Sequence, residues 1–283
     1  MCRLFGLTAG AHRVRSTFWL LDAPDSLLDQ SRRNPDGCGV AGFTATGEVE
    51  LHKAPVAAFD DPGFGTAARD LVSATFVAHV RHASTGANTY QNTHPFVDGA
   101  VAFAHNGALA GLDLLEAHLG PAIGRVHGDT DSERMFALIL TETAAHDGDL
   151  GAGITAAVRW LAAHVPVLSL NLILTTPAAL WALRYPATDE LWILQRPAGG
   201  QHGDQHLHGT GQHGGIRVHS PDLRDRPAVV VASERLDDHP DWQLLAPGEL
   251  VHVDTRLGVR RRQVLFQPPV YPCATRAAHP PTG

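Results

Sequence analysis

The stretch that decides the fold is Met1-Cys2-Arg3-Leu4-Phe5-Gly6-Leu7 (residues 1–7), where a cysteine directly follows the initiator methionine. Cysteine is small enough for methionine aminopeptidase to remove Met1, which leaves Cys2 with a thiol and a free α-amine. An N-terminal amine can serve as the base that activates such a nucleophile, because its pKa of roughly 7.7–8.0 lies near neutrality. Residues 3–9 are largely apolar and predict a buried strand that holds Cys2 at its end. The alternative is that Cys2 occupies this position by chance and has no catalytic role.

Length and composition limit the class of protein. The chain has 283 residues, enough for one large domain with a sizeable core. A net charge of −7 and a pI near 6.2 argue against binding to nucleic acid or an anionic membrane. No stretch approaches the roughly 20 apolar residues that span a bilayer, and the N-terminus lacks the features of a secretory signal. Because Cys2, Cys38 and Cys273 do not make a disulfide framework, we expect a cytoplasmic protein.

The apolar pattern predicts runs of strands broken by a block of helices. We expect strands within residues 3–9, 34–43, 48–53, 75–82, 101–105, 168–196 (a run of strands), 228–234, 249–254 and 259–266. We expect helices over residues 64–73, 111–119, 131–146 and 152–164, with a partly helical segment over 16–33. Asn106-Gly107 is predicted to be the turn that ends strand 101–105. This order indicates mixed α and β structure with mostly antiparallel sheets.

Four short motifs carry polar residues that suit chemistry: NPDGCG (34–39), RHASTG (81–86), AHNG (104–107) and GDTDSE (128–133). Each has an ordinary structural explanation when taken alone. Arg81 suits the protein surface, and Asn-Gly is a common hairpin turn. Thr130 or Asp131 can cap a helix with Glu133 in its first turn. In this order behind an N-terminal cysteine, however, the four motifs together are specific for one family of proteins.

With these motifs the chain resembles the class II glutamine amidotransferases, which are N-terminal-nucleophile hydrolases. In particular it is similar to small free-standing bacterial members, such as the γ-glutamyl hydrolase of ergothioneine biosynthesis. The resemblance runs from MCRLFG through NPDGCGVAGF, VRHASTG, QNTHPF and AHNGALAG to GDTDSE, and resumes at VVVASERLDDHPDW and APGELVHVD. It implies an α+β fold of four layers, αββα, with two antiparallel sheets between helices. We expect this type 2 glutamine amidotransferase domain to cover residues 1–267.

The resemblance also implies the catalytic residues. Cys2 is the expected nucleophile that attacks the side-chain amide of a γ-glutamyl group. The side chain of Asn106 and the backbone N–H of Gly107 are the expected donors to the oxyanion. Losing one donor of this kind typically costs roughly 2.7–4 kcal/mol in the transition state.

Four further positions are the expected binding residues for the glutamate head. Arg81 resembles the residue that holds the α-carboxylate, where a planar guanidinium gives a bidentate pair. Asp131 resembles the partner of the α-ammonium. Ser84 and Thr85 occupy pocket positions at which side chains vary within the family.

These roles predict an amidohydrolase that releases glutamate through a glutamyl-thioester and needs no metal or other cofactor. Its substrate is either glutamine or a γ-glutamyl-conjugated metabolite. One alternative is a glutaminase subunit that supplies ammonia to a separate synthetase partner. Another is a non-catalytic binding subunit with the same fold. We favour the conjugate, because we expect little ordered structure beyond residue 266 and so no room for a synthetase domain.

Two segments fall outside the resemblance. Residues 198–215 are glycine-rich and contain His202, His206, His208 and His213. They suit either a metal-binding tract or a surface loop, and the loop is favoured because no cysteine or carboxylate cluster completes a ligand set. The proline-rich residues 268–283 are expected to be a poorly ordered tail.

The remaining cysteine and histidines near the motifs have two interpretations each. Cys38 stands where related small members often have tryptophan, and it is either a second thiol near Cys2 or, as we favour, a small buried residue. The motif histidines lack a recognisable ligand spacing, so structural hydrogen bonding is favoured over a metal site. They are His79, His82, His94 and His105.

Overall fold

Two antiparallel sheets pack face to face in the computed structural model, which describes residues 2–83, 86–198, 223 and 226–273. The seven-stranded sheet has the order β12 (Gln243–Leu244), β9 (Trp192–Arg196), β11 (Ala228–Ala232), β1 (Arg3–Thr8), β4 (Thr75–Arg81), β2 (Gly37–Phe43) and β3 (Val49–Ala54). The six-stranded sheet has the order β14 (Val259–Gln263), β13 (Glu249–Val253), β8 (Ala179–Arg184), β7 (Val167–Thr176), β6 (Val101–Leu109) and β5 (Phe96–Asp98).

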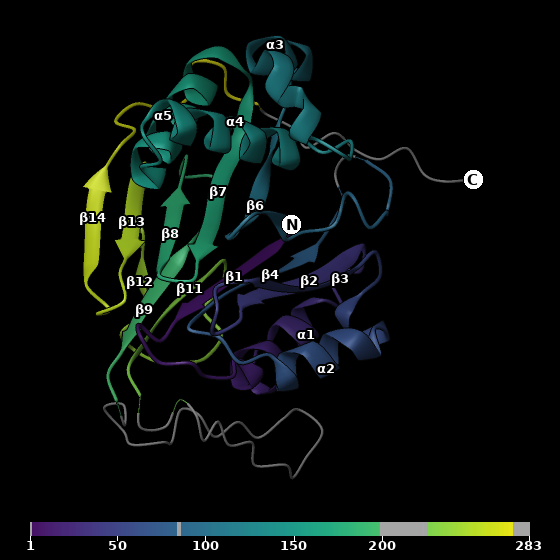
Figure 1. The fold of residues 1–283 in the computed structure, drawn as a ribbon, viewed down its shortest axis with the longest axis vertical. Coiled ribbons are helices and arrows are strands. Elements are labelled where there is room, and N and C mark those ends of the chain that lie inside the picture. The colour runs from purple at the N-terminus through teal and green to yellow at the C-terminus, as the bar shows by residue number, and fades with distance from the viewer. Residues whose placement is uncertain (1, 84–85, 199–222, 224–225, 274–283) are drawn as a thin grey trace.

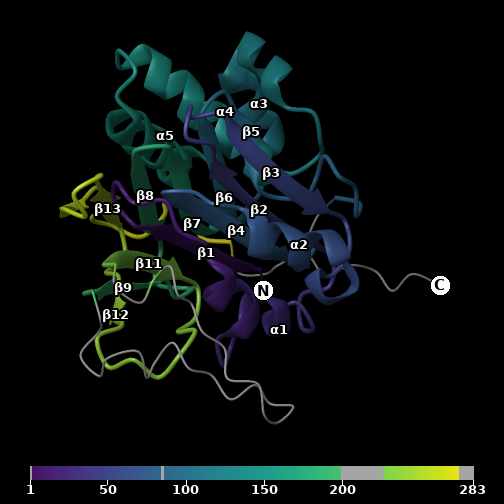
Figure 2. The same cartoon turned by 60° about the horizontal axis from the view of Figure 1, so that its bottom comes forward.

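Helices cover the outer face of each sheet (Figures 1 and 2). The seven-stranded sheet carries η1 (Phe18–Asp22), α1 (Leu27–Gln30), η2 (Ala58–Asp60) and α2 (Pro62–Asp70). The six-stranded sheet carries α3 (Leu112–Leu119), η3 (Gly120–Arg125), α4 (Asp131–Ala145) and α5 (Leu150–His164). The predicted four-layer αββα fold is therefore confirmed. No helix in the described part of the chain is long and apolar enough to cross a membrane.

The alternation of side chains along β1 places Cys2 on the face between the two sheets. Phe5 and Leu7 point into the core beneath the helices, whereas Leu4 belongs to the core between the sheets. Successive side chains of a strand point to opposite faces, so Cys2 lies on the same face as Leu4. The same rule places Arg81 with Val77 on β4, facing the six-stranded sheet.

Most of the expected elements are present, and two expectations are wrong. Strand β6 continues to Leu109, so Asn106 and Gly107 lie inside a strand and not in a turn. The other error concerns the start of the tail. The N–H groups of Val270 and Cys273 donate to the carbonyls of Ala162 and Val167, each at 2.9 Å. Residues 268–273 are thus bound to the last turn of α5 and to the start of β7. Residues 274–283 and 199–215 lie outside the described residues.

Candidate functional site

Strands β1 and β4 bring Cys2 beside the end of Arg81. Their antiparallel register pairs Arg3 with Val80, so Cys2 lies next to the chain segment that leaves β4. The backbone N–H of His82 donates to the Cys2 Sγ at 3.2 Å, and the Sγ lies 3.3 Å from the His82 carbonyl oxygen. The thiol is partly exposed and forms no disulfide.

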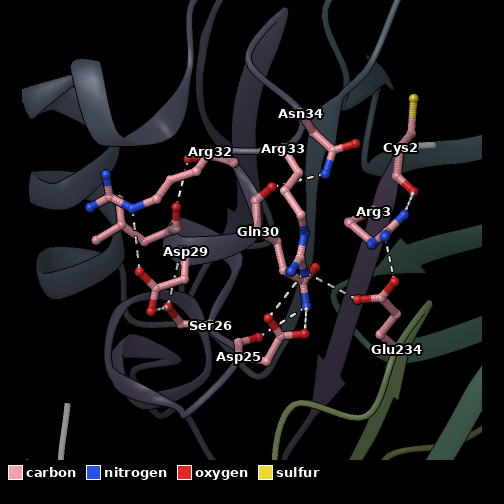
Figure 3. A network of polar contacts seen from close by, with 12 residues as sticks. Cys2, Arg3, Asp25, Ser26, Asp29, Gln30, Arg32, Arg33, Asn34 and Glu234 are labelled. Atoms are coloured by element: carbon pink, nitrogen blue, oxygen red, sulfur yellow. Dashed lines mark hydrogen bonds and ion pairs between the residues drawn. The ribbon is translucent and has the colours of Figure 1, made fainter. Parts of the chain in front are cut away.

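A polar network holds the backbone of Cys2 from below (Figure 3). The Nη1 of Arg3 donates to the Cys2 carbonyl at 3.2 Å, and Arg3 forms an ion pair with Glu234. Glu234 also lies 3.6 Å from the guanidinium of Arg33. The neighbouring Ser233 accepts the Leu4 N–H at 2.9 Å. The motif VVVASERLDD therefore fixes the start of β1, which explains its place in the resemblance.

Arg81 is buried between the sheets, with only 3% of its surface exposed. Its Nη1 donates to the Asn88 Oδ1 at 2.8 Å, and its Nη2 donates to the Gly86 carbonyl at 3.3 Å. Burial lowers the pKa of Arg81, while attraction to Cys2, Asp36 and Asp131 opposes that shift. The structure thus places the expected nucleophile, Cys2, and two of the four expected binding residues, Arg81 and Asp131, close enough to interact electrostatically.

The segment after Arg81 is held by two side chains to which the sequence analysis assigned no role. Asp36 accepts the Ala83 N–H at 2.8 Å and the Asn88 Nδ2 at 3.2 Å. Asn92 donates to the Ala87 carbonyl at 3.0 Å and accepts the Asp129 N–H at 2.8 Å. Asp36 lies in the motif NPDGCG and Asn92 in the motif QNTHPF, and these positions are the sequence signal that could have identified them. Ser84 and Thr85 lie outside the described residues.

Asp131 begins helix α4 and turns its carboxylate toward β6. Its Oδ2 accepts the Leu109 N–H at 2.7 Å, and its Oδ1 accepts the Ser132 N–H at 2.9 Å. Thr130 is the N-cap, because its side chain accepts the Glu133 N–H at 3.2 Å, which confirms the expected cap. A carboxylate in the first turn is favoured by the helix dipole.

Asn106 and Gly107 lie in β6, on the sheet that faces Cys2 and Arg81. Asn106 is 2% exposed, and its Nδ2 has no hydrogen-bond partner among the described residues. A Cβ at position 107 would lie 1.9 Å from the Ser169 carbonyl oxygen, so only glycine allows β6 and β7 to approach here. His105, which precedes Asn106, is fixed by contacts to the Ser132 Oγ at 2.9 Å and the Ser169 carbonyl at 3.0 Å.

The sequence model of the class-II glutamine amidotransferases matches residues 1–264. The chain belongs to this family. A probable glutamine amidotransferase of Saccharomyces cerevisiae (DUG3) is 30% identical over 179 residues, which cover 53% of this chain and 50% of the yeast protein. An uncharacterized protein of Methanocaldococcus jannaschii is 37% identical over 124 residues, 42% of this chain and 33% of that protein. The chain therefore matches half or less of the length of these relatives.

Solved structures share the fold of this chain. A glutamine aminotransferase class-II domain protein from Silicibacter pomeroyi superposes with a TM-score of 0.60 at 22% identity, covering 93% of this chain and 99% of the other. The glutamine phosphoribosylpyrophosphate amidotransferase of Bacillus subtilis gives a TM-score of 0.63 at 18% identity, covering 94% of this chain and 50% of the other. At these identities the likeness concerns the fold alone.

Two buried histidines, His79 and His94, lie close to Arg81. The rings of His79 and His94 are 4.2 Å apart, and the nitrogens of His94 have no hydrogen-bond partner among the described residues. The expected structural hydrogen bonding is therefore wrong for His94, whereas it is confirmed for His105. A hydrogen bond with the backbone of His105 opposes the effect of burial on the pKa of His79. Burial lowers the pKa of His79 to about 3 and that of His94 well below its usual range. Both rings are neutral, which avoids charge repulsion with Arg81.

Cys38 is fully buried in the core beneath the helices, on the opposite face of the sheet from Cys2. Its Sγ lies 3.6 Å from the Asp61 Oδ2. Burial is the main cause that raises the pKa of this thiol. Its interpretation as a small buried residue is confirmed. The described part of the chain holds no cluster of three or more metal-ligating side chains.

Proposed function

We propose that the chain is an N-terminal-cysteine amidohydrolase that cleaves γ-glutamyl amides and releases glutamate. The observation that carries this proposal is the Nδ2 of Asn106. A buried amide donor without a partner costs stability, so such groups call for an explanation. An oxyanion that forms only during the reaction supplies one, because a preorganised donor is most useful where charge develops.

Four side chains take part in the proposed reaction, each with a different role. After removal of Met1, the α-amine of Cys2 accepts the thiol proton as the sulfur attacks the amide carbon. The carbonyl oxygen becomes an oxyanion, which Asn106 and the Gly107 N–H stabilise. The C–N bond breaks, the leaving amine takes the proton back from the α-ammonium, and water hydrolyses the thioester to glutamate. Arg81 and Asp131 hold the α-carboxylate and α-ammonium throughout.

The preferred substrate under this proposal is a γ-glutamyl conjugate with a leaving group larger than ammonia. The partly exposed Cys2 supports this, as does the neighbouring His82, whose side chain is 49% exposed. We infer that a larger leaving group extends toward this exposed side of Cys2. A glutaminase subunit that feeds a synthetase partner remains the alternative. It is distinguished by faster turnover of glutamine than of bulkier γ-glutamyl amides, with stimulation by a co-purifying synthetase.

Asn106→Leu tests the proposal most directly. We expect kcat/KM for glutamate release to fall about 10²–10³-fold, the usual loss for one oxyanion donor. We expect an unchanged or higher melting temperature, because the variant removes an unpartnered buried amide. The protein is made without an N-terminal tag, and intact-mass measurement verifies the loss of Met1.

Two results would contradict the proposal. One is near wild-type turnover by Asn106→Leu in a folded protein. The other is the absence of glutamate release from glutamine and from γ-glutamyl amides alike by protein with an exposed Cys2. The second result would favour a non-catalytic binding subunit.

A further inference from the structure

A second pocket opens between the edge strands β3 and β5, apart from the site at Cys2. Its volume is about 560 Å³, within the usual range for small-molecule sites. Lys53, Tyr90, Phe96 and Phe136 are among its lining residues. Thr93 lies between the two sites. It packs over Gly37, the strand partner of Arg81, and its carbonyl accepts the Lys53 ammonium at 2.8 Å.

Lys53 is the only lysine of a chain that has 22 lysines and arginines together. Its Nζ lies 4.6 Å from the centre of the Tyr90 ring and 5.3 Å from that of Phe96. The hydrogen bond to Thr93 uses one of the three donors of the ammonium. Within the described ranges Lys53 forms no ion pair.

Two carboxylates line this pocket, and both already have partners. The Glu133 Oε2 accepts the Gly128 N–H at 2.7 Å, and its Oε1 lies 3.4 Å from the His127 Nδ1. Asp98 forms an ion pair with Arg125. The charge left without a close counter-ion is therefore that of Lys53. Burial lowers the pKa of Lys53 to about 8, and attraction to Glu133 opposes that shift.

We propose that this pocket binds a small carboxylate that carries a flat aromatic body. The carboxylate accepts the two remaining donors of Lys53, which gives a charge-assisted pair in a partly buried setting. The aromatic body packs against Phe96, Phe136 and Tyr90, which supply apolar area and preferred ring geometries. The proposal concerns binding and does not depend on the hydrolysis of γ-glutamyl amides.

Calorimetric titration with 3-phenylpropionate and its neutral amide, 3-phenylpropionamide, tests the charge requirement. For the wild type we expect the carboxylate to bind at least about tenfold tighter than the amide, which corresponds to roughly 1.4 kcal/mol. Lys53→Met keeps the length of the side chain without its charge and should remove this preference. Lys53→Arg should retain part of it. Arg69→Met on α2, the matched control, removes an exposed cation outside the pocket and should bind both probes as the wild type does.

The pH dependence provides a second measurement. Affinity for 3-phenylpropionate should fall as the pH rises through about 8, where Lys53 loses its proton, while affinity for the amide stays flat. Equal affinity for the two probes, or no binding of the carboxylate at about 10 mM, would overturn the proposal. So would unchanged carboxylate affinity in folded Lys53→Met. If that variant does not fold, the two-probe comparison on wild-type protein decides.

Discussion

Arg81 and Lys53 lie on the same face of the seven-stranded sheet but in different surroundings. They belong to β4 and β3, and the strand between them pairs Gly37 with Arg81 and Gly39 with Lys53. Arg81 donates to Asn88 and to backbone carbonyls, and Asp36 and Asp131 attract it. Lys53 has one hydrogen bond and two aromatic rings.

This difference separates a site in which the cation already has several polar partners from a pocket in which the cation has no close counter-ion. The motifs fix the surroundings of Arg81 from several elements, because Asn88 and the backbone of residues 86–87 accept its hydrogen bonds and Asp36 holds the same segment. The Lys53 pocket contains parts of the motif QNTHPF, and its two lining acids, Glu133 and Asp98, contact other groups.

The largest effect is expected for Cys2→Ala. Loss of the thiol should lower turnover of any γ-glutamyl amide by at least about 10⁴-fold, because the covalent route is removed. The fold and the binding of 3-phenylpropionate at Lys53 should persist, since the change lies at a strand end. Cys273→Ala is the matched control, because the bond of residue 273 to Val167 involves only its backbone N–H. Substantial glutamate release by Cys2→Ala would disprove the nucleophile assignment.

Arg81→Lys should have the next largest effect. An ammonium cannot make the bidentate pair of a guanidinium with a carboxylate, so we expect a fall of about 10²-fold in kcat/KM. Asp131→Asn should lose activity as well, through loss of the ammonium partner. Steady-state kinetics on glutamine and on a bulkier γ-glutamyl amide measure both variants. If both kept near wild-type kcat/KM on every substrate, the assignment of the glutamate pocket would be wrong.

Local pattern predicted most of the fold, because each strand alternates or is uniformly apolar and each long helix has a capped, periodic sequence. The errors arise where a partner strand overrides a local signal. Asn106-Gly107 is a strong turn signal, yet close pairing with β7 keeps both residues extended. Strand β5 has only three residues, too few for a pattern. The segment up to Cys273 is ordered by pairing with residues distant in sequence, including Val167.

The candidate site was more accessible to prediction than the second pocket, for a physical reason. Cys2, Arg81 and Asp131 each belong to a contiguous motif, and the resemblance predicts that the three residues form one active site. Lys53 stands in an ordinary strand, and its pocket exists only because β3 and β5 end their sheets side by side. The unpartnered state of Asn106 was equally invisible, because it depends on what surrounds the amide in space.

Acid should destabilise the region between the two pockets. His79 and His94 have pKa values lowered by burial, to about 3 for His79, against about 6.5 in the unfolded chain. Below pH 6.5 the unfolded chain therefore takes up protons that the folded protein does not. The free energy of unfolding should fall with decreasing pH, by up to about 1.4 kcal/mol per pH unit for each histidine.

Urea unfolding between pH 5 and pH 7 measures this dependence. His79→Leu should flatten it, whereas His146→Asn, an exposed control, should leave it unchanged. A wild-type stability that is independent of pH in this range would show that the two rings are not held neutral.

The smallest effect is expected when residues 200–213 are replaced by a short Gly-Ser linker. These residues lie outside the described ranges, but the two strands that flank them are described. They connect β9 to β11, and the pair Arg196–Ala228 marks the end from which they leave. That end of β11 lies beside Thr8, which pairs with Val229, whereas Cys2 precedes the other end of β1. Six residues of strand at about 3.3 Å each place roughly 20 Å between this end and Cys2.

We therefore expect kcat/KM within about twofold and a melting temperature within about 2 °C of the wild type, since long insertions contribute little to stability. A large loss of activity that zinc restores in the wild type would instead support a metal-binding role for the histidines of this segment.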